Sequence, residues 1–165
     1  MIYFDSNKQA YAFEIPEYIC TVKDNVWAEY AGTDKWDIID GVFTDITNTS
    51  EYKEKKTEER EADFKSKFFY INGFGWYRKQ PKGYQSAIES LNTAFNRFVL
   101  MQQAGLEEFP AGVFIFYSAP DFTKPEECTE DWLINHQYRN QAMTVLEFGN
   151  FYATFTDAWN TEEHE

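Results

Sequence analysis

The fold of the N-terminal third is decided by the stretch Trp27-Ala-Glu-Tyr-Ala-Gly-Thr-Asp-Lys-Trp-Asp-Ile-Ile-Asp-Gly-Val-Phe-Thr-Asp-Ile46. Its second half contains the dipeptide Asp40-Gly41 between two short apolar runs. Asp and Gly both tolerate the positive φ angles that a two-residue hairpin turn requires. The sequence therefore predicts a β-hairpin over residues 36–46.

A short helix is predicted just before this hairpin. Asp24 is expected to be its N-cap, because a carboxylate can accept from the free N–H groups of the first turn. Gly32 follows the predicted end of the helix, where glycine is favoured. Trp27 and Tyr30 are three positions apart and so share one face of this helix.

Two short strands are predicted at the start of the chain, at residues 2–5 and 10–15. Asn7 lies between them and favours a turn, and Pro16 ends the second run. Together with the helix and the hairpin, these strands predict a small antiparallel β module over residues 1–48.

Residues 49–67 form a predicted linker helix. Three acidic residues each precede a basic residue by four positions, which is the favourable orientation for ion pairs on a helix. The pairs are Glu51–Lys55, Glu61–Lys65 and Asp63–Lys67. A helix that is polar almost all round usually connects modules or lies exposed. We therefore interpret this helix as the boundary between two units.

The remaining residues, 68–165, are predicted to form an aromatic-rich α+β domain. Strands are expected at residues 68–73 and 113–117, and the glycines of residues 73–83 favour a loop. Three helices are expected: one opened by the Ser86–Glu89 capping box, with a stripe of Ile88, Leu91, Phe95, Phe98 and Val99; one capped by Thr129; and one opened by the Thr144–Glu147 capping box.

The last of these helices has the strongest amphipathic pattern of the chain. Its aromatic stripe consists of Phe148, Phe151, Tyr152, Phe155 and Trp159, which recur at helical spacing. The complete prediction is an α+β chain with a small antiparallel β module, a charged linker helix, and helices packed on a short sheet.

The composition indicates a folded protein without a membrane segment. Of 165 residues, 43% are apolar and 19% are aromatic, which is enough for a core. No apolar run approaches the roughly 20 residues needed to span a bilayer, and no secretory signal pattern is present. Cys20 and Cys128 are far apart in the sequence and are expected to be free thiols.

The net charge of −13 is concentrated at the two ends of the chain. Residues 1–50 carry nine acids and three bases, and residues 120–165 carry ten acids and two bases. Direct binding to nucleic acid is therefore disfavoured, because phosphates would be repelled.

The sequence carries no recognisable catalytic or metal-binding motif. His136 and His164 lack partners at ligand spacing, and no Cys-x-x-Cys is present. Acidic residues surround Cys128, which raises a thiol pKa rather than activating it. We therefore expect no cofactor, no metal and no enzymatic activity. An enzyme would require a deep pocket that contains two carboxylates or the Arg78 loop.

A binding site is predicted in the loop 73–83. Aromatic and basic residues alternate there, which suits ring stacking combined with anion contact. The predicted binding residues are Trp76, Tyr77, Arg78, Lys79 and Lys82. Two alternatives stay open: the rings could pack inward, and Arg78 could pair with the protein's own acidic residues.

The N-terminal 50 to 60 residues resemble the small tail-fibre-associated, tail-fibre-assembly-like proteins of bacteriophages and prophages. The resemblance rests on the opening Met1-Ile-Tyr-Phe-Asp5, on Ile15-Pro16, on the Trp27–Tyr30 pair, and on Trp36-Asp-Ile-Ile-Asp-Gly41 leading into a charged helix. It implies a non-enzymatic role in protein contact and assembly, and a location in the bacterial host cytoplasm or the virion. It supplies no catalytic residues.

Two functional hypotheses follow. In the first, the protein contacts a phage tail component through Trp27, Tyr30 and Trp36 and through the loop residues, since aromatic residues are common interface anchors. In the second, it is an acidic inhibitor of a host defence nuclease, in the manner of an anti-CRISPR or DNA-mimic protein. The acidic face would then consist of Glu126, Glu127, Glu130 and Asp131. The oligomeric state stays open.

Overall fold

The computed structural model describes residues 1–79, 86–105, 108–109 and 111–161. The protein is α+β, as predicted, with antiparallel sheets and helices. The chain divides into two compact units, Met1–Lys56 (unit 1) and Thr57–Glu165 (unit 2).

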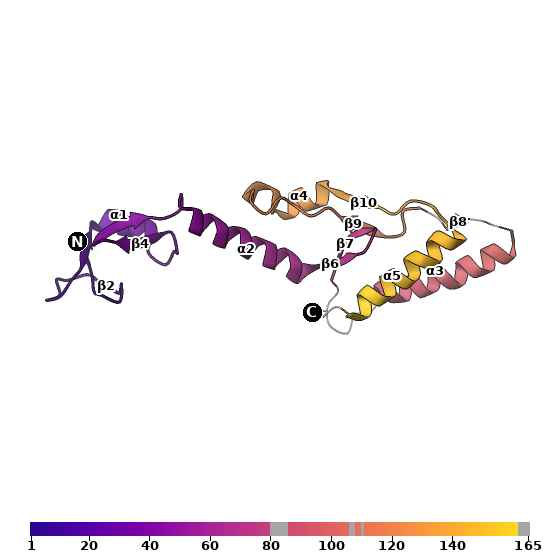
Figure 1. Cartoon of the computed structure of the whole chain (residues 1–165), viewed down its shortest axis with the longest axis horizontal. Helices are drawn as coiled ribbons and strands as arrows, with labels where there is room; N and C mark the ends of the chain where they lie inside the picture. The colour runs from indigo at the N-terminus through magenta and orange to yellow at the C-terminus, as the bar shows by residue number, and fades with distance from the viewer. Residues whose placement is uncertain (80–85, 106–107, 110, 162–165) are drawn as a thin grey trace. The chain divides into compact units, whose positions relative to one another are not determined.

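Unit 1 contains a three-stranded antiparallel sheet, a short helix and a hairpin (Figure 1). The sheet order is β2-β1-β3. The elements are β1 (Ile2–Phe4), β2 (Ala10–Tyr11), β3 (Cys20–Val22), α1 (Asp24–Tyr30), β4 (Trp36–Ile39) and β5 (Val42–Asp45).

The predicted hairpin is confirmed. β4 and β5 pair antiparallel, with Ile38 opposite Phe43 and Ile39 opposite Val42. The turn residue Asp40 has φ 51° and Gly41 has φ 76°, so both adopt the left-handed conformation that the dipeptide favours.

Two local predictions in unit 1 are wrong. The second strand ends at Tyr11 instead of residue 15. Tyr11 pairs with Tyr3, and β1 begins at Ile2, so β1 offers only one more residue for the second strand to pair with. Asp24 is the first helical residue and not the N-cap, which is Lys23. The Asp24 carboxylate instead accepts from the amino group of Met1 at 2.6 Å.

Helix α2 (Ser50–Lys67) confirms the predicted charged helix. Two of the predicted pairs form, with Lys65 Nζ 2.8 Å from Glu61 and Lys67 Nζ 3.1 Å from Asp63. The boundary between the two units falls within this helix. The division into residues 1–48, 49–67 and 68–165 therefore stays a prediction.

Unit 2 is built on a four-stranded antiparallel sheet of order β10-β9-β7-β6. A second, two-stranded sheet pairs β11 with β8. Besides the end of α2, the elements are β6 (Phe68–Ile71), β7 (Gly75–Arg78), α3 (Ser86–Gln103), β8 (Glu108–Phe109), β9 (Ile115–Tyr117), the 3-10 turn η1 (Pro125–Glu127), α4 (Glu130–Asn135), β10 (Gln137–Arg139), β11 (Met143–Thr144) and α5 (Val145–Thr161).

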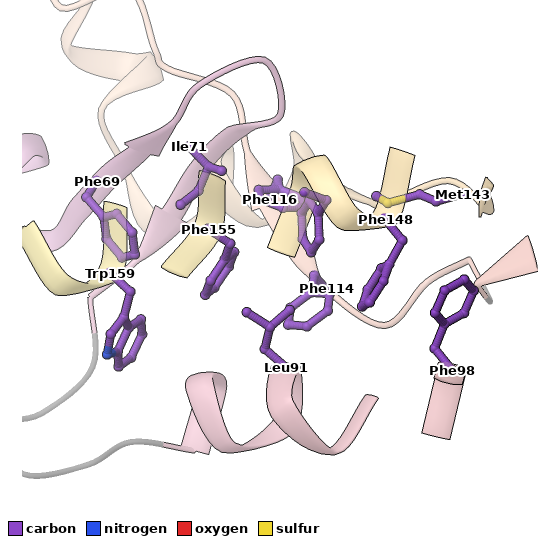
Figure 2. Close-up of a cluster of buried hydrophobic side chains, with 11 residues drawn as sticks. Phe69, Ile71, Leu91, Phe98, Phe114, Phe116, Met143, Phe148, Phe155 and Trp159 are labelled. Carbon is purple, nitrogen blue, oxygen red and sulfur yellow. The ribbon is translucent and has the colours of Figure 1, made fainter. Parts of the chain in front are cut away.

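The four-stranded sheet is covered by apolar side chains on both faces. Helices α3 and α5, which lie side by side in Figure 1, supply most of the cover on one face. Figure 2 shows Leu91, Phe114 and Phe155 converging between these helices and the sheet. On the other face, Phe68 packs with Phe64 of α2 and Leu133 of α4. Strand alternation sends neighbouring residues to these two cores.

The capping box of α5 forms as predicted. The Thr144 N–H donates to Glu147 at 2.8 Å, and the Glu147 N–H donates to the Thr144 hydroxyl at 3.3 Å. The aromatic stripe that follows is confirmed, with Phe148, Phe151 and Phe155 fully buried. Thr129 caps α4 as predicted by accepting from the Trp132 N–H. The side chain of Ser86 lies outside the described residues, so its capping box stays a prediction.

The predicted loop over residues 73–83 is wrong at residues 75–78, which form strand β7. Gly73 and Gly75 shape the tight turn between β6 and β7, where the Phe74 N–H donates to the Ile71 carbonyl at 2.9 Å. A side chain at Gly75 would collide with Tyr138. Gly73 and Gly75 therefore allow the tight hairpin turn, and Gly75 also allows the Tyr138 ring to approach the backbone closely.

Candidate docking surface

The predicted contact residues of unit 1 pack against its own core. The rings of Trp27 and Trp36 are 5.2 Å apart in an edge-to-face arrangement, and Trp36 stacks on Phe43 at 5.2 Å. Both tryptophans are half-buried against a core of Phe4, Cys20 and Val22. The structure thus gives these rings an internal role, and their contact with a partner stays a prediction.

Tyr30 is also engaged within the unit. Its ring packs on Phe43 at 5.3 Å, and its hydroxyl donates to Asp45 at 2.7 Å. This hydrogen bond raises the pKa of Tyr30. Bonds from Thr47 and then from Tyr30 lower the pKa of Asp45. The pair therefore fixes α1 to the end of the hairpin.

The predicted binding rings of unit 2 point inward. Tyr77 contacts Phe155 at 4.9 Å, and burial raises its pKa to about 12. Trp76 lies on the opposite face of the sheet, 5.1 Å from Phe64. The open alternative of inward packing is thus the one that the structure adopts, because residues 75–78 form a strand whose two faces are both covered.

Arg78 has the intramolecular role that the sequence left open. Its guanidinium donates to Glu130 at 2.5 Å and lies over the Phe68 ring at 4.7 Å. The Lys79 N–H donates to the Lys67 carbonyl at 2.8 Å. Lys82 lies outside the described residues. Among the basic residues that were predicted to bind an anion, Arg78 is thus paired with Glu130 of the same unit.

The four residues of the predicted acidic face lie close in the chain, on η1 and α4. Glu130 pairs with Arg78, and Glu127 is 3.5 Å from Lys124 and accepts from the Asp121 N–H at 2.9 Å. Glu126 and Asp131 are exposed. Because two of the four carboxylates have basic partners, the set offers less negative charge than its sequence indicates.

Cys20 and Cys128 are free thiols, as predicted. The pKa of Cys128 is raised, chiefly by burial, while Arg60 lowers it and the neighbouring acids Glu127, Asp121 and Glu126 raise it further. A raised pKa keeps the thiol protonated near neutral pH, which argues against a nucleophilic role.

Unit 1 exposes several large apolar side chains, among them Met1, Phe13 and Tyr18, and one group of them lies at the tip of the hairpin. Ile39 and Val42 are directly opposite each other and are 44% and 61% exposed. Ile19, which is 43% exposed, lies next to the turn, since a Cβ on Gly41 would be 3.5 Å from its carbonyl oxygen. We name Ile19, Ile39 and Val42 the hairpin-tip patch.

Sequence reasoning missed this patch although the signal was present. Ile38 and Phe43 face the core, so alternation places Ile39 and Val42 on the outer face. The tryptophans suggested anchors, but at the hairpin the aliphatic side chains of Ile39 and Val42 are the exposed ones.

The described residues contain no cluster of three or more His, Cys, Asp or Glu that could hold a metal ion. No helix among them combines the length and the apolar character needed to cross a membrane. Comparison of the chain with protein-family models, with curated proteins and with solved structures found no match in any of the three.

Proposed function

We propose that the protein is a non-enzymatic, phage-derived interaction protein that takes part in tail assembly and docks onto a tail component through the hairpin-tip patch. It would act in the bacterial host cytoplasm or in the virion. The resemblance of residues 1–60 supports the phage origin, and the exposed patch is the observation that supports docking.

The patch is apolar, as the centre of a protein interface usually is. Ile39 and Val42 lie opposite each other on the outer face of the hairpin, and the backbone of Ile19 lies next to its turn. The inner face of the hairpin packs on the core of unit 1 through Trp36, Ile38 and Phe43. The aromatic packing behind them gives the patch a firm support, which lowers the entropy cost of binding. A central apolar group surrounded by polar residues is the usual arrangement at protein interfaces.

Charge indicates what kind of partner fits. Residues 1–50 carry nine acids and three bases, so the patch lies on a strongly acidic module. A partner surface with an apolar centre and a basic rim would complement it and would be steered toward it in solution.

The test is a pull-down in which the purified protein is incubated with each tail protein that is encoded beside its gene, and the recovered tail protein is measured. Val42→Asp, which places a charge in the patch, should weaken binding by about 30-fold, the size of an interface hot spot. Leu100→Asp is the matched control, because Leu100 is an exposed aliphatic residue of α3 in unit 2. Failure to recover any tail protein, or equal effects of the two variants, would refute the proposal.

The acidic-inhibitor alternative predicts a different outcome of the same experiment. A DNA-binding host protein would be recovered in place of a tail protein, and Glu126→Gln with Asp131→Asn would abolish recovery. The pairing of Glu127 and Glu130 with basic residues makes this the second choice.

A further inference from the structure

The three-stranded sheet of unit 1 uses only one of its two faces for the core. Side chains alternate between the faces along a strand. Phe4 and Cys20 are buried in the core of unit 1. Tyr3, the residue before Phe4 in β1, therefore lies on the other face, and so does Tyr11, which is directly opposite Tyr3 in β2. The outer face of the sheet thus begins with two neighbouring tyrosines.

Two further rings extend this outer face. Phe13 and Tyr18 lie in the segment between β2 and β3. The Tyr18 ring contacts the Tyr3 ring edge to face, with 5.3 Å between the ring centroids. The Phe13 ring contacts the Tyr11 ring in the same way at 6.0 Å. Phe13 is 67% exposed and Tyr18 is 45% exposed. We name Tyr3, Tyr11, Phe13 and Tyr18 the outer aromatic face.

The segments that carry these rings are anchored by hydrogen bonds. The Asp5 carboxylate accepts from two N–H groups of the turn between β1 and β2, at 2.8 and 2.9 Å, and from the Tyr11 hydroxyl at 3.1 Å. The Ile19 N–H donates to the Phe4 carbonyl at 2.8 Å, directly after Tyr18. The rings are thus held by an ordered backbone, which lowers the entropy cost of binding.

The hydrogen-bonding groups of the outer aromatic face favour a ligand with many acceptors and few donors. Among the described residues, none forms a hydrogen bond with the Tyr3 or the Tyr18 hydroxyl. Both hydroxyls can therefore donate to a carbonyl of a ligand. An ordinary peptide also brings one N–H group per residue, and aromatic rings are weak acceptors for such groups. Proline has no N–H, so a proline-rich segment leaves few donors without a partner.

The charges beside the rings favour a basic ligand. Residues 1–22 carry three acidic side chains and one basic side chain, Lys8, which pairs with a carboxylate of β4. Glu14 directly follows Phe13 and is exposed. Glu17 directly precedes Tyr18 and is also exposed. These carboxylates would attract an arginine or a lysine of the ligand, and the exposed ring faces are favourable contacts for the same cations.

We propose that the outer aromatic face binds a proline-rich segment of a partner protein that also carries arginine or lysine. Such a segment adopts the polyproline II helix, which has about three residues per turn and solvated carbonyls, and which is largely formed before binding. Surfaces of exposed aromatic rings recognise this helix by packing against its proline rings. The two ring pairs supply the packing surface, the two tyrosine hydroxyls supply donors, and the acids supply the opposite charge.

The chain itself contains no such segment. Its five prolines are separate from one another, and the closest two, Pro120 and Pro125, are five residues apart. The ligand is therefore a segment of another protein. The inference goes beyond the proposed function, because the outer aromatic face shares no residue with the hairpin-tip patch.

The experiment begins with selection of random twelve-residue peptides on the immobilised full-length chain. The selected peptides should be enriched in prolines spaced about three residues apart, and in arginine or lysine, relative to the starting library. The peptide that is selected most often is then synthesised with a fluorescent label and serves as the probe. Selection of no peptide, or of peptides without enrichment in proline, would overturn the proposal.

Variants of the protein test whether the probe binds to these rings. Tyr18→Ala and Phe13→Ala should each weaken binding of the probe by about tenfold, because each removes the exposed ring of one pair. Tyr70→Ala is the matched control and should leave binding unchanged, since Tyr70 is a half-exposed tyrosine of β6 in unit 2. Equal effects of the Tyr18 and Tyr70 variants would overturn the proposal. If a ring variant fails to fold, the composition of the selected peptides still decides on the unchanged chain.

A change in the probe tests the role of charge. Replacing its arginines and lysines by glutamine should weaken binding by about tenfold at low salt. The same replacement should have little effect at about 1 M salt, where surface charges are screened. Binding at low salt that does not depend on these bases would overturn the proposal.

Two further results separate this inference from its alternatives. Val42→Asp should leave binding of the probe unchanged while weakening recovery of a tail protein, so each proposal can fail alone. Sedimentation that shows a dimer of the parent chain and a monomer of Tyr18→Ala would assign the outer aromatic face to a second copy and overturn the proposal.

Discussion

Among the described glycines, Gly75 has the least room for a side chain, and Gly75→Ala is therefore expected to destabilise unit 2. Gly75 has φ +138°, a conformation that is nearly restricted to glycine. A Cβ there would overlap the Tyr138 hydroxyl and lie 3.0 Å from Cζ of the same ring. The Tyr138 ring would have to leave its stack on Phe116 and its hydrogen bond to the Phe74 carbonyl.

The magnitude combines two effects. Backbone strain at such a φ costs about 1–3 kcal/mol, and the lost hydrogen bond costs about 1 kcal/mol. Gly75→Ala should therefore lower the free energy of unfolding by about 2–4 kcal/mol. Gly73→Ala is the control, because Gly73 also has a positive φ, +81°, but has open space around its Cβ position. Backbone strain alone should lower the free energy of unfolding of the Gly73→Ala variant by about 1–2 kcal/mol.

Hydrogen exchange measured by mass spectrometry can place the effect on β6 and β7, and urea unfolding gives its size. Tyr138→Phe removes the overlapping hydroxyl, so the double variant with Gly75→Ala should be about 1 kcal/mol more stable than additivity requires. If Gly75→Ala costs no more than Gly73→Ala, or if the double variant is strictly additive, the Tyr138 side chain does not restrict position 75.

Three further predictions concern unit 2. Phe155→Ala should lower the free energy of unfolding by about 3–5 kcal/mol, measured by urea titration, because the fully buried Phe155 ring contacts five other rings of the core. Tyr77 should ionise only near pH 12 in a spectrophotometric titration, and Tyr77→Phe should remove that late step. Since its pKa rises from 10 to about 12 on folding, its contribution to stability is complete below pH 10 and is lost as the pH rises through 12. Asn140→Ala should cost about 1–3 kcal/mol by leaving the Phe114 N–H unpaired, and faster exchange of that amide would confirm the cause.

Much of the local structure could be predicted from the sequence. Asp40-Gly41 specified the hairpin, alternating charges specified α2, and the Thr144–Glu147 capping box specified the start of α5. Each of these signals acts over a few residues, through allowed φ angles, ion pairs or hydrogen bonds to the adjacent backbone. Such signals do not depend on what the rest of the chain does.

The surfaces could not be predicted in the same way. Trp76 and Tyr77 sit in a sequence rich in glycine and basic residues, which favours a loop, but the ladder with β6 makes them a strand. Whether a ring is an anchor or part of a core depends on the segments packed against it. For Tyr77 these include α5, which lies more than sixty residues away in the chain.

By itself, the sequence determined the α+β class, the hairpin, the charged helix, the aromatic stripe of α5 and the two free thiols, because propensity, spacing and capping are local properties. Only the tertiary structure decided that Trp27 and Trp36 face inward and that the hairpin-tip patch faces outward. It also decided that Arg78 pairs with Glu130, fifty-two residues away, and that Tyr138 of β10 lines a groove together with Glu147 and Asn150 of α5. Burial, charge pairing and the walls of a groove arise when distant segments meet, and no single stretch of sequence contains them.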